Sequence, residues 1–348
     1  MLTIIIKERE WYIMAITLAQ AKVGMADKVA QQVIDEFRRG SLLLDAMTFD
    51  NAVSPGTGGS TLTYGYVRKK TPATAQFRAL NSEYTAQEAD REKCSVDLKT
   101  FGGSFNIDRV IANSSGTIDE INYQLQEKIK AASNLFHYTV INGDSATDTN
   151  AFDGLNKALV GQKTELGTNT YIDLSSSSAI DTNWKVFLDA LDEFLAEISG
   201  TPSMIMGNSK MITRIKQVAR RAGYLTQSED AFGRKVDAYD GIPLVDLKYY
   251  TSVSGSIVSE VPVVPIVDTR KPGSASSEVT GLTDIYAVTM DIANGFHGVS
   301  LTGNNLINTY LPDLKAPGAV KTGEVEMTAA VALKNTRSAG VLRNIKIK

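Results

Sequence analysis

The chain is poor in cysteine and histidine. Among its 348 residues are one cysteine, Cys94, and two histidines, His137 and His297. A single cysteine excludes an internal disulfide and the disulfide-stapled class of secreted domain, so cytosolic production is expected. These three side chains are also too few for a Cys/His zinc site within one chain. No apolar run reaches the roughly 20 residues that span a bilayer, so no membrane partner is expected.

Strong charge of either sign is also lacking. Lysine and arginine number 36 against 39 aspartates and glutamates, and the net charge of −3 does not favour wrapping nucleic acid. Hydrophobic residues make up 43% of the chain, which allows sizeable cores, and the length predicts two domains. No repeat of about 20–50 residues is visible, which argues against solenoids and propellers.

The N-terminus does not resemble a signal peptide. Leu2 to Ile6 is a short apolar stretch without a preceding basic residue or a small-residue cleavage site. Residues 7–10 can be encoded by purine-rich codons, and Met14 follows at the spacing of a bacterial ribosome-binding site from a start codon. We hypothesise that translation begins at Met14 and that residues 1–13 are a leader or a non-native extension.

A polar hairpin is predicted after the Ser/Gly/Pro-rich loop at residues 54–60. The outgoing strand alternates through Leu62, Tyr64 and Tyr66, and the returning strand alternates from Cys94 to Leu98. A two-stranded ribbon is at best marginally stable alone in water, so this one needs a partner, and another subunit is the natural candidate.

One unusually long helix is predicted at residues 118–142. Thr117 and Glu120 form a capping-box pattern, and Asn142-Gly143 is a favourable end. Apolar residues follow at steps of three and four: Ile118, Ile121, Leu125, Ile129, Ala132, Phe136 and Val140. About 25 residues give a rod of roughly 37 Å, about twice the usual helix length, which is typical of a structural axis.

The remaining chain predicts an α/β region. Helices are expected at residues 27–39, 184–198 and 209–222, with Ser209 as an N-cap and Gly223 as a stop. Strands are expected at 203–206, on both sides of Asp240-Gly241, and at 261–267 and 285–290. Residues 163–182 are expected to be irregular, Asn113 to Gly116 a turn, and Gly102-Gly103 a bulge or bend. The strands at 325–333 and 341–347 are expected to pair as a hairpin.

Candidate chemical sites are weak. The loop Gly56 to Gly59 lacks the Gly-Lys-Ser/Thr of a P-loop and leads into a strand, so a flexible hairpin base is favoured. No Gly-x-Ser-x-Gly elbow accompanies His137 or His297, so both are interpreted as structural. The carboxylates Asp189, Asp192, Glu193 and Glu197 share one helix face opposite an apolar stripe, which favours a solvated face over paired acid/base catalysis.

A small basic cluster occupies the predicted hairpin tip. Arg68, Lys69, Lys70 and Arg78 are open to three interpretations: contact with DNA phosphates, pairing with an acidic surface of a neighbouring subunit, or solubility of an exposed loop. Cys94 lies in an alternating strand and is interpreted as a small buried apolar residue. No catalytic, cofactor-binding or metal-binding residues are therefore assigned.

The order of these elements resembles the major capsid proteins of tailed bacteriophages, the Hong Kong 97 type fold. The matching stretches are residues 26–49, 61–98, 101–109, 118–142, 184–198, 209–222 and 240–244. The resemblance implies an α+β fold with an N-terminal arm (14–55), an extended β-hairpin loop (56–99) and a peripheral domain (100–150 and 301–348) containing the spine helix 118–142. An α/β axial domain (151–300) completes it.

The resemblance also implies a function. It implies a non-enzymatic, cofactor-free subunit that self-assembles through hexamers and pentamers into the icosahedral shell enclosing phage double-stranded DNA. The subunit would be assembled in the host bacterial cytoplasm and reside in the virion. Implied partners are a portal protein, a decoration protein and, non-specifically, the packaged DNA. The arm is too short to include a scaffolding region, so a separate scaffolding protein is implied.

Some capsid proteins of this type carry a Lys–Asn cross-link. Lys69 or Lys70 with Asn335 or Asn344 would supply the residue types, but no motif supports it.

Two alternatives to the capsid function stay open. One is an encapsulin-type compartment shell of the same fold. The other is an α/β hydrolase built on residues 178–300, which the missing nucleophile motif and the scarcity of histidine weaken.

Overall fold

The computed structural model describes residues 43–53, 61–114, 119–223, 226–229, 235–254, 257–273, 277–302 and 306–348. The predicted leader, the helix at 27–39 and the glycine-rich loop lie outside these residues. The chain divides into two compact units. The first contains Phe101–Ala132 and Ile307–Met327, and the second contains Arg38–Thr100, Ser133–Leu306 and Thr328–Lys348. None of the described helices is long and apolar enough to cross a membrane.

The first unit is built on paired strands. β16 (Val320–Leu333) pairs antiparallel with β15 (Ile307–Tyr310) and also pairs with β4 (Lys99–Asp108). β4 runs through the glycine pair where a bulge or bend was predicted. A Cβ on Gly102 would collide with the carbonyl oxygen of Val325, so this glycine is required for close strand approach.

The predicted spine helix is confirmed as α4 (Glu120–Asn142), with α3 (Arg109–Ser114) shortly before it. α3 includes Asn113 and Ser114, so the prediction of a turn there was wrong for those two residues. Asp119 caps α4, because its Oδ1 accepts the N–H groups of Ile121 at 3.1 Å and Asn122 at 3.3 Å. Thr117, the predicted cap, lies outside the described residues.

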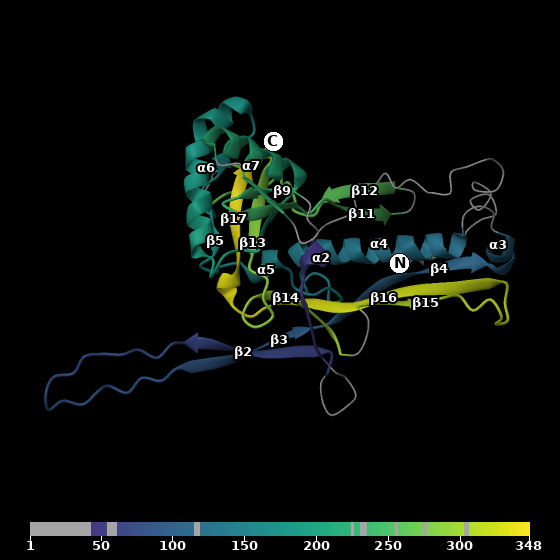
Figure 1. Ribbon diagram of the computed structural model, residues 1–348, viewed down its shortest axis with the longest axis horizontal. Helices are drawn as coiled ribbons and strands as arrows, with labels where there is room; N and C mark the ends of the chain where they lie inside the picture. Colours follow the sequence, from purple (N-terminus) through teal and green to yellow (C-terminus); the bar gives the residue numbers. More distant parts are fainter. Residues whose placement is uncertain are drawn as a thin grey trace, which may run out of the picture. The chain divides into compact units, whose positions relative to one another are not determined.

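The second unit contains an eight-stranded α/β sheet (Figure 1). Its order is β5-β17-β13-β7-β10-β9-β8, with β6 also paired to β17. The strands are β5 (Glu165–Leu166), β6 (Ile172–Asp173), β7 (Met204–Gly207), β8 (Thr226–Glu229), β9 (Lys235–Tyr239), β10 (Ile242–Asp246), β13 (Leu282–Val288) and β17 (Ala339–Lys346). α6 (Ser177–Glu197) and α7 (Ser209–Ala222) pack on it through buried residues such as Phe187, Leu191 and Ile215.

Several local predictions in this unit need correction. β17 pairs antiparallel with β13 in the α/β sheet, whereas β16 pairs with β14 (Phe296–Leu301), so the predicted C-terminal hairpin was wrong. The short 3₁₀ helix Thr336–Ser338 carries the chain from one sheet to the other. Residues 163–182 contain β5, β6 and the start of α6. The N-cap of α7 is Asn208, whose Oδ1 accepts the Met211 N–H at 2.9 Å, while Ser209 is its first helical residue.

Smaller elements complete the second unit. α2 (Leu43–Ala46) precedes β1 (Phe49–Val53), which pairs parallel with β14, and α5 (Leu155–Ala158) follows the spine helix. The hairpin of β11 (Tyr249–Ser254) and β12 (Ile257–Pro262) is held to α4 by Asn134, which donates to the Tyr249 carbonyl at 2.8 Å. The extended ribbon is β2 (Thr63–Thr71) paired with β3 (Asp90–Asp97), as predicted.

Candidate functional site

The root of the β2–β3 ribbon is bound to its own chain. The Tyr66 hydroxyl donates to the Leu333 carbonyl at 3.0 Å. Arg68 donates from Nη2 to the same carbonyl at 2.8 Å and from Nε to the Lys334 carbonyl at 3.0 Å. These carbonyls lie at the end of β16, so the expectation that the whole ribbon needs another subunit was wrong for its root.

Tyr64 extends this anchor. It is buried, its hydroxyl donates to Asp50 Oδ2 at 2.8 Å, and its ring lies at 80° to the His297 ring with 5.9 Å between the centroids. The Lys334 ammonium lies over the Tyr64 ring, 5.5 Å from its centroid. Burial, reinforced by the neighbouring Asp50, raises the pKa of the Tyr64 hydroxyl, so it stays a hydrogen-bond donor at neutral pH.

The distal part of the ribbon has no such support. Between Thr71 and Asp90 no described residue is in a strand, and every side chain is exposed. Phe77 and Leu80 are fully open to solvent, at 108% and 92% relative exposure. These two large apolar side chains therefore have no cover from the described part of the chain.

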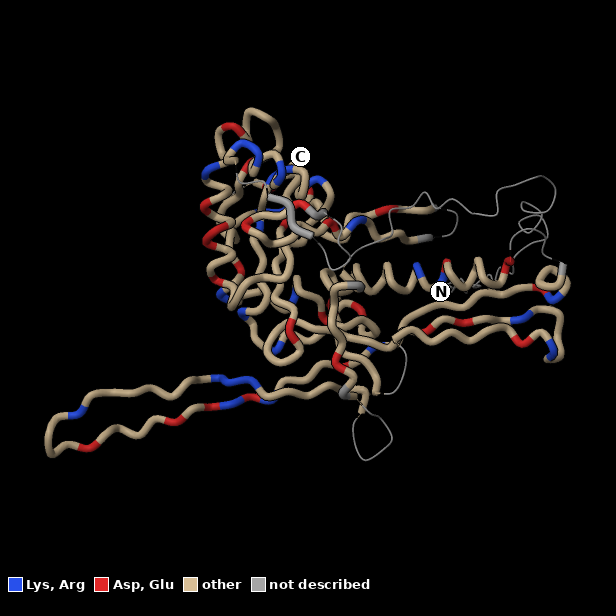
Figure 2. Tube along the Cα trace, viewed as in Figure 1, with Lys and Arg blue, Asp and Glu red and all other residues tan. Residues whose placement is uncertain are grey.

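The basic cluster does not lie together at the tip. Arg68 is part of the root, where it also faces Glu92 at 3.7 Å, and Lys70 faces Asp90 at 3.6 Å across the ribbon. Arg78 alone is distal, with its guanidinium 5.4 Å from the Tyr84 ring centroid. Figure 2 shows cations along the outgoing leg and acidic residues mainly along the returning leg.

The structure separates the two histidines by environment. His137 lies in α4, is 3% exposed, and has no hydrogen-bond partner for either ring nitrogen among the described residues. Burial lowers its pKa to about 4, so it is neutral at pH 7. His297 lies in β14 under Tyr64. Across the described residues, no group of three or more His, Cys, Asp or Glu side chains is arranged as a metal site.

The carboxylates of α6 and Cys94, the remaining candidate residues, form no reactive pair within the described part of the chain. On α6, Asp192 accepts the Tyr239 hydroxyl at 2.6 Å, and Glu197 faces Arg337 at 3.6 Å. Asp189 and Glu193 are exposed, as a solvated face predicts. Cys94 is half-buried, and its Sγ lies 3.9 Å from Glu92 Oε1.

The residue types proposed for a cross-link are held in different ways. The buried Asn344 amide donates to the Gly167 and Thr168 carbonyls at 2.8 and 3.2 Å, which leaves it unsuited to reaction with a lysine. Asn335 accepts the Arg337 N–H at 3.0 Å, and Lys69 pairs across the ribbon with Arg91.

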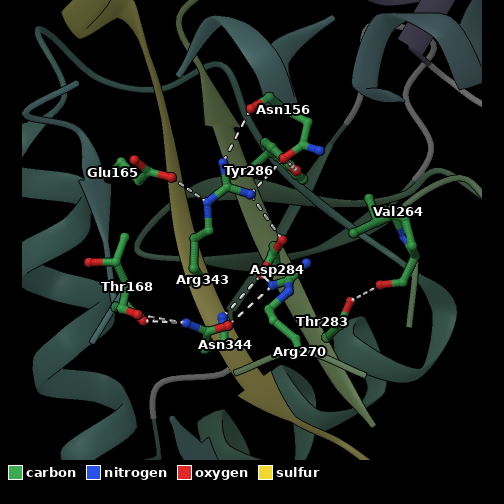
Figure 3. Close-up of polar contacts among 12 residues, drawn as sticks. Asn156, Glu165, Thr168, Val264, Arg270, Thr283, Asp284, Tyr286, Arg343 and Asn344 are labelled. Atoms are coloured by element: carbon green, nitrogen blue, oxygen red, sulfur yellow. Dashed lines mark hydrogen bonds and ion pairs between the residues drawn. The ribbon is translucent and has the colours of Figure 1, made fainter. Parts of the chain in front are cut away.

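A buried polar network escaped prediction (Figure 3). Arg343 contacts Glu165 at 2.5 Å and Asp284 at 3.3 Å, and Asp284 also contacts Arg270 at 2.5 Å. Asn344 donates its backbone N–H to Asp284 at 3.0 Å. The signal was present in the sequence, since Arg343-Asn344 interrupts an otherwise apolar strand. Because every cation here faces a carboxylate, the network is suited to fixing the sheet.

No protein-family profile and no curated protein matches the chain. Several solved structures, in contrast, match nearly the whole chain. An encapsulin complex from Synechococcus elongatus shares 14% identity over 96% of this chain and 97% of its own, with a TM-score of 0.61. The capsid of Myoviridae phage XM1 shares 10% identity over 95% and 99%, with a TM-score of 0.53. The capsid of an empty GTA particle shares 11% identity over 94% of this chain and 98% of its own, with a TM-score of 0.52.

The chain has the Hong Kong 97 type capsid fold. The α+β assignment made from the sequence is thereby confirmed, together with the extended hairpin and the spine helix. Among the described residues of this capsid fold, the exposed distal ribbon is the candidate functional site.

Proposed function

We propose that this protein is the major capsid subunit of a tailed double-stranded DNA phage. It assembles through hexamers and pentamers into an icosahedral shell and has a structural, non-enzymatic role. One observation carries the proposal. In a chain with the capsid fold, the ribbon is anchored at its root by Arg68 and Tyr66 but presents Phe77 and Leu80 entirely to solvent. Neighbouring copies in a shell would cover those side chains.

The same proposal includes partners and location. The shell lies in the virion, is assembled in the host bacterial cytoplasm, and encloses DNA without specific contacts. A separate scaffolding protein, a portal protein and a decoration protein are the further partners. We assign residues 14–55 to the arm, 56–99 to the extended loop, 100–150 and 301–348 to the peripheral domain, and 151–300 to the axial domain. We make one exception within 301–348: β17 (Ala339–Lys346) belongs to the axial and not the peripheral domain, because it pairs with β13.

Removing the distal ribbon while keeping its root tests the proposal. Thr71 and Asp90 are paired residues, so residues 72–89 can be replaced by an Asn-Gly turn. We expect folded, soluble subunits that no longer form shells when the upstream and neighbouring genes are co-expressed. A full-length chain with Phe77→Ser and Leu80→Ser separates loss of apolar contact from loss of length. Normal shells from the shortened chain, viewed by negative-stain microscopy, would contradict the proposal.

The encapsulin similarity motivates a second arm of this experiment. An encapsulin-type shell would enclose protein cargo in place of DNA. The content of shells purified from the natural source, nuclease-protected DNA or a co-purifying enzyme, separates the two functions.

A further inference from the structure

The root of the ribbon lies on a fully buried imidazole. His297 in β14 is 0% exposed. Its Nδ1 lies 3.4 Å from the Gly295 carbonyl oxygen, and within the described part of the chain its Nε2 has no hydrogen-bond partner. Burial lowers the pKa of this imidazole, which is therefore neutral at pH 7.

Several charged and titratable groups lie close enough to influence His297. The Tyr64 ring of β2 lies at 80° to the imidazole, with 5.9 Å between the centroids, and the Lys334 ammonium lies over the Tyr64 ring. Lys334 opposes a positive charge on His297, whereas Asp50 of β1 and Asp291, which precedes β14, favour one. Burial is the largest influence and acts against the charge.

These groups also hold the ribbon in place. Asp50 accepts the Tyr64 hydroxyl, and the carbonyl of Lys334 accepts Arg68 Nε. An imidazolium in this buried site is stabilised if water enters the root or if Asp50 turns from Tyr64 towards the new charge. Either change removes the Tyr64 anchor, so charge at His297 and closure of the root oppose each other.

We propose that His297 is a pH-sensitive switch for the ribbon: the neutral imidazole keeps the root closed on β1 and β14, and protonation opens it. The switch operates within one chain, so it is independent of the proposed shell function. It would let acid alter the orientation of the ribbon before the cores of the subunit unfold.

Amide hydrogen exchange of the purified full-length subunit tests this switch. After correction for intrinsic exchange, opening of β2 (Thr63–Thr71) is expected to increase by up to about tenfold for each pH unit below 6.5, because one proton is coupled to opening. Amides of β13 should stay protected at the same pH, which separates local opening from global unfolding. The acid response should be absent in His297→Gln and present in His137→Gln, the matched control.

A second variant keeps the test decisive if His297→Gln does not fold. Lys334→Met removes an ammonium that lowers the pKa of His297 in the closed root, so the difference in pKa between the closed and open roots narrows and the acid-induced opening of β2 should be smaller than in the wild type. The proposal is overturned if β2 exchange is independent of pH in the wild type. It is equally overturned if the acid response persists in His297→Gln, or if Lys334→Met leaves the size of the response unchanged or increases it.

Discussion

Replacement of Arg343 by methionine removes the centre of the buried polar network. The Arg343 side chain is 11% exposed and lies between Glu165, also 11% exposed, and Asp284, 4% exposed. Methionine keeps much of the apolar stem but supplies no charge and no donor. Glu165 then loses its cation, whereas Asp284 keeps Arg270 at 2.5 Å. Removing one partner of a buried ion pair typically costs about 3–5 kcal/mol. Since Asp284 stays paired, we expect the lower end, about 3 kcal/mol.

Urea denaturation of unassembled subunits, followed by far-UV circular dichroism, measures this cost. With a slope of about 2 kcal/mol per molar urea, the midpoint should fall by about 1.5 M. Lys346→Met is the matched control on the same strand, because Lys346 faces Asp173 at 3.9 Å with side chains 26% and 33% exposed. That partly exposed pair should contribute less than about 1 kcal/mol. Equal midpoint shifts for the two variants would refute the reasoning that burial gives the Arg343 network its strength.

Three further changes test other parts of the structure. The pKa of His137 is about 4 when folded and 6.5 when unfolded, so the unfolded chain binds more protons between these values. The free energy of unfolding should therefore fall by about 3 kcal/mol from pH 7 to 4. In His137→Leu this part of the fall should be missing, so its urea midpoint should decrease less between pH 7 and 4 than that of the wild type. Gly102→Ala should lower the free energy of unfolding by about 2 kcal/mol, because the new Cβ collides with the Val325 backbone. Gly103→Ala should cost less, because its Cβ meets only the flexible Lys128 side chain, and equal melting temperatures of the two variants would refute this reasoning. Asn208→Ala removes an N-cap and two buried donors, and should lower the melting temperature more than the simple cap variant Ser176→Ala.

Elements with strong periodicity were predictable from the sequence. The spine helix and the hairpin follow from regular spacing of apolar residues, and Gly223, with a φ of 76°, ends α7 as its position indicated. Caps were less predictable, because Asn208 and Ser209 are both good capping residues and only the tertiary contacts of Asn208 decide between them.

Long-range pairing and local anchoring were not predictable in the same way. Two alternating strands joined by a short turn suggest a hairpin, but β17 pairs with β13, about 55 residues earlier in the chain, while β16 pairs with β14. Arg68 was interpreted as part of a basic tip because its neighbours are lysines. Its actual role depends on carbonyls of Leu333 and Lys334 that are more than 260 residues away.

Cryo-electron microscopy of particles formed by this chain with its neighbouring gene products tests the capsid function most directly. We expect icosahedral shells in which the ribbon at residues 72–89 lies on an adjacent copy and Phe77 and Leu80 are buried there. A chain that stays monomeric under all assembly conditions would contradict the capsid function. So would shells in which those two side chains remain exposed.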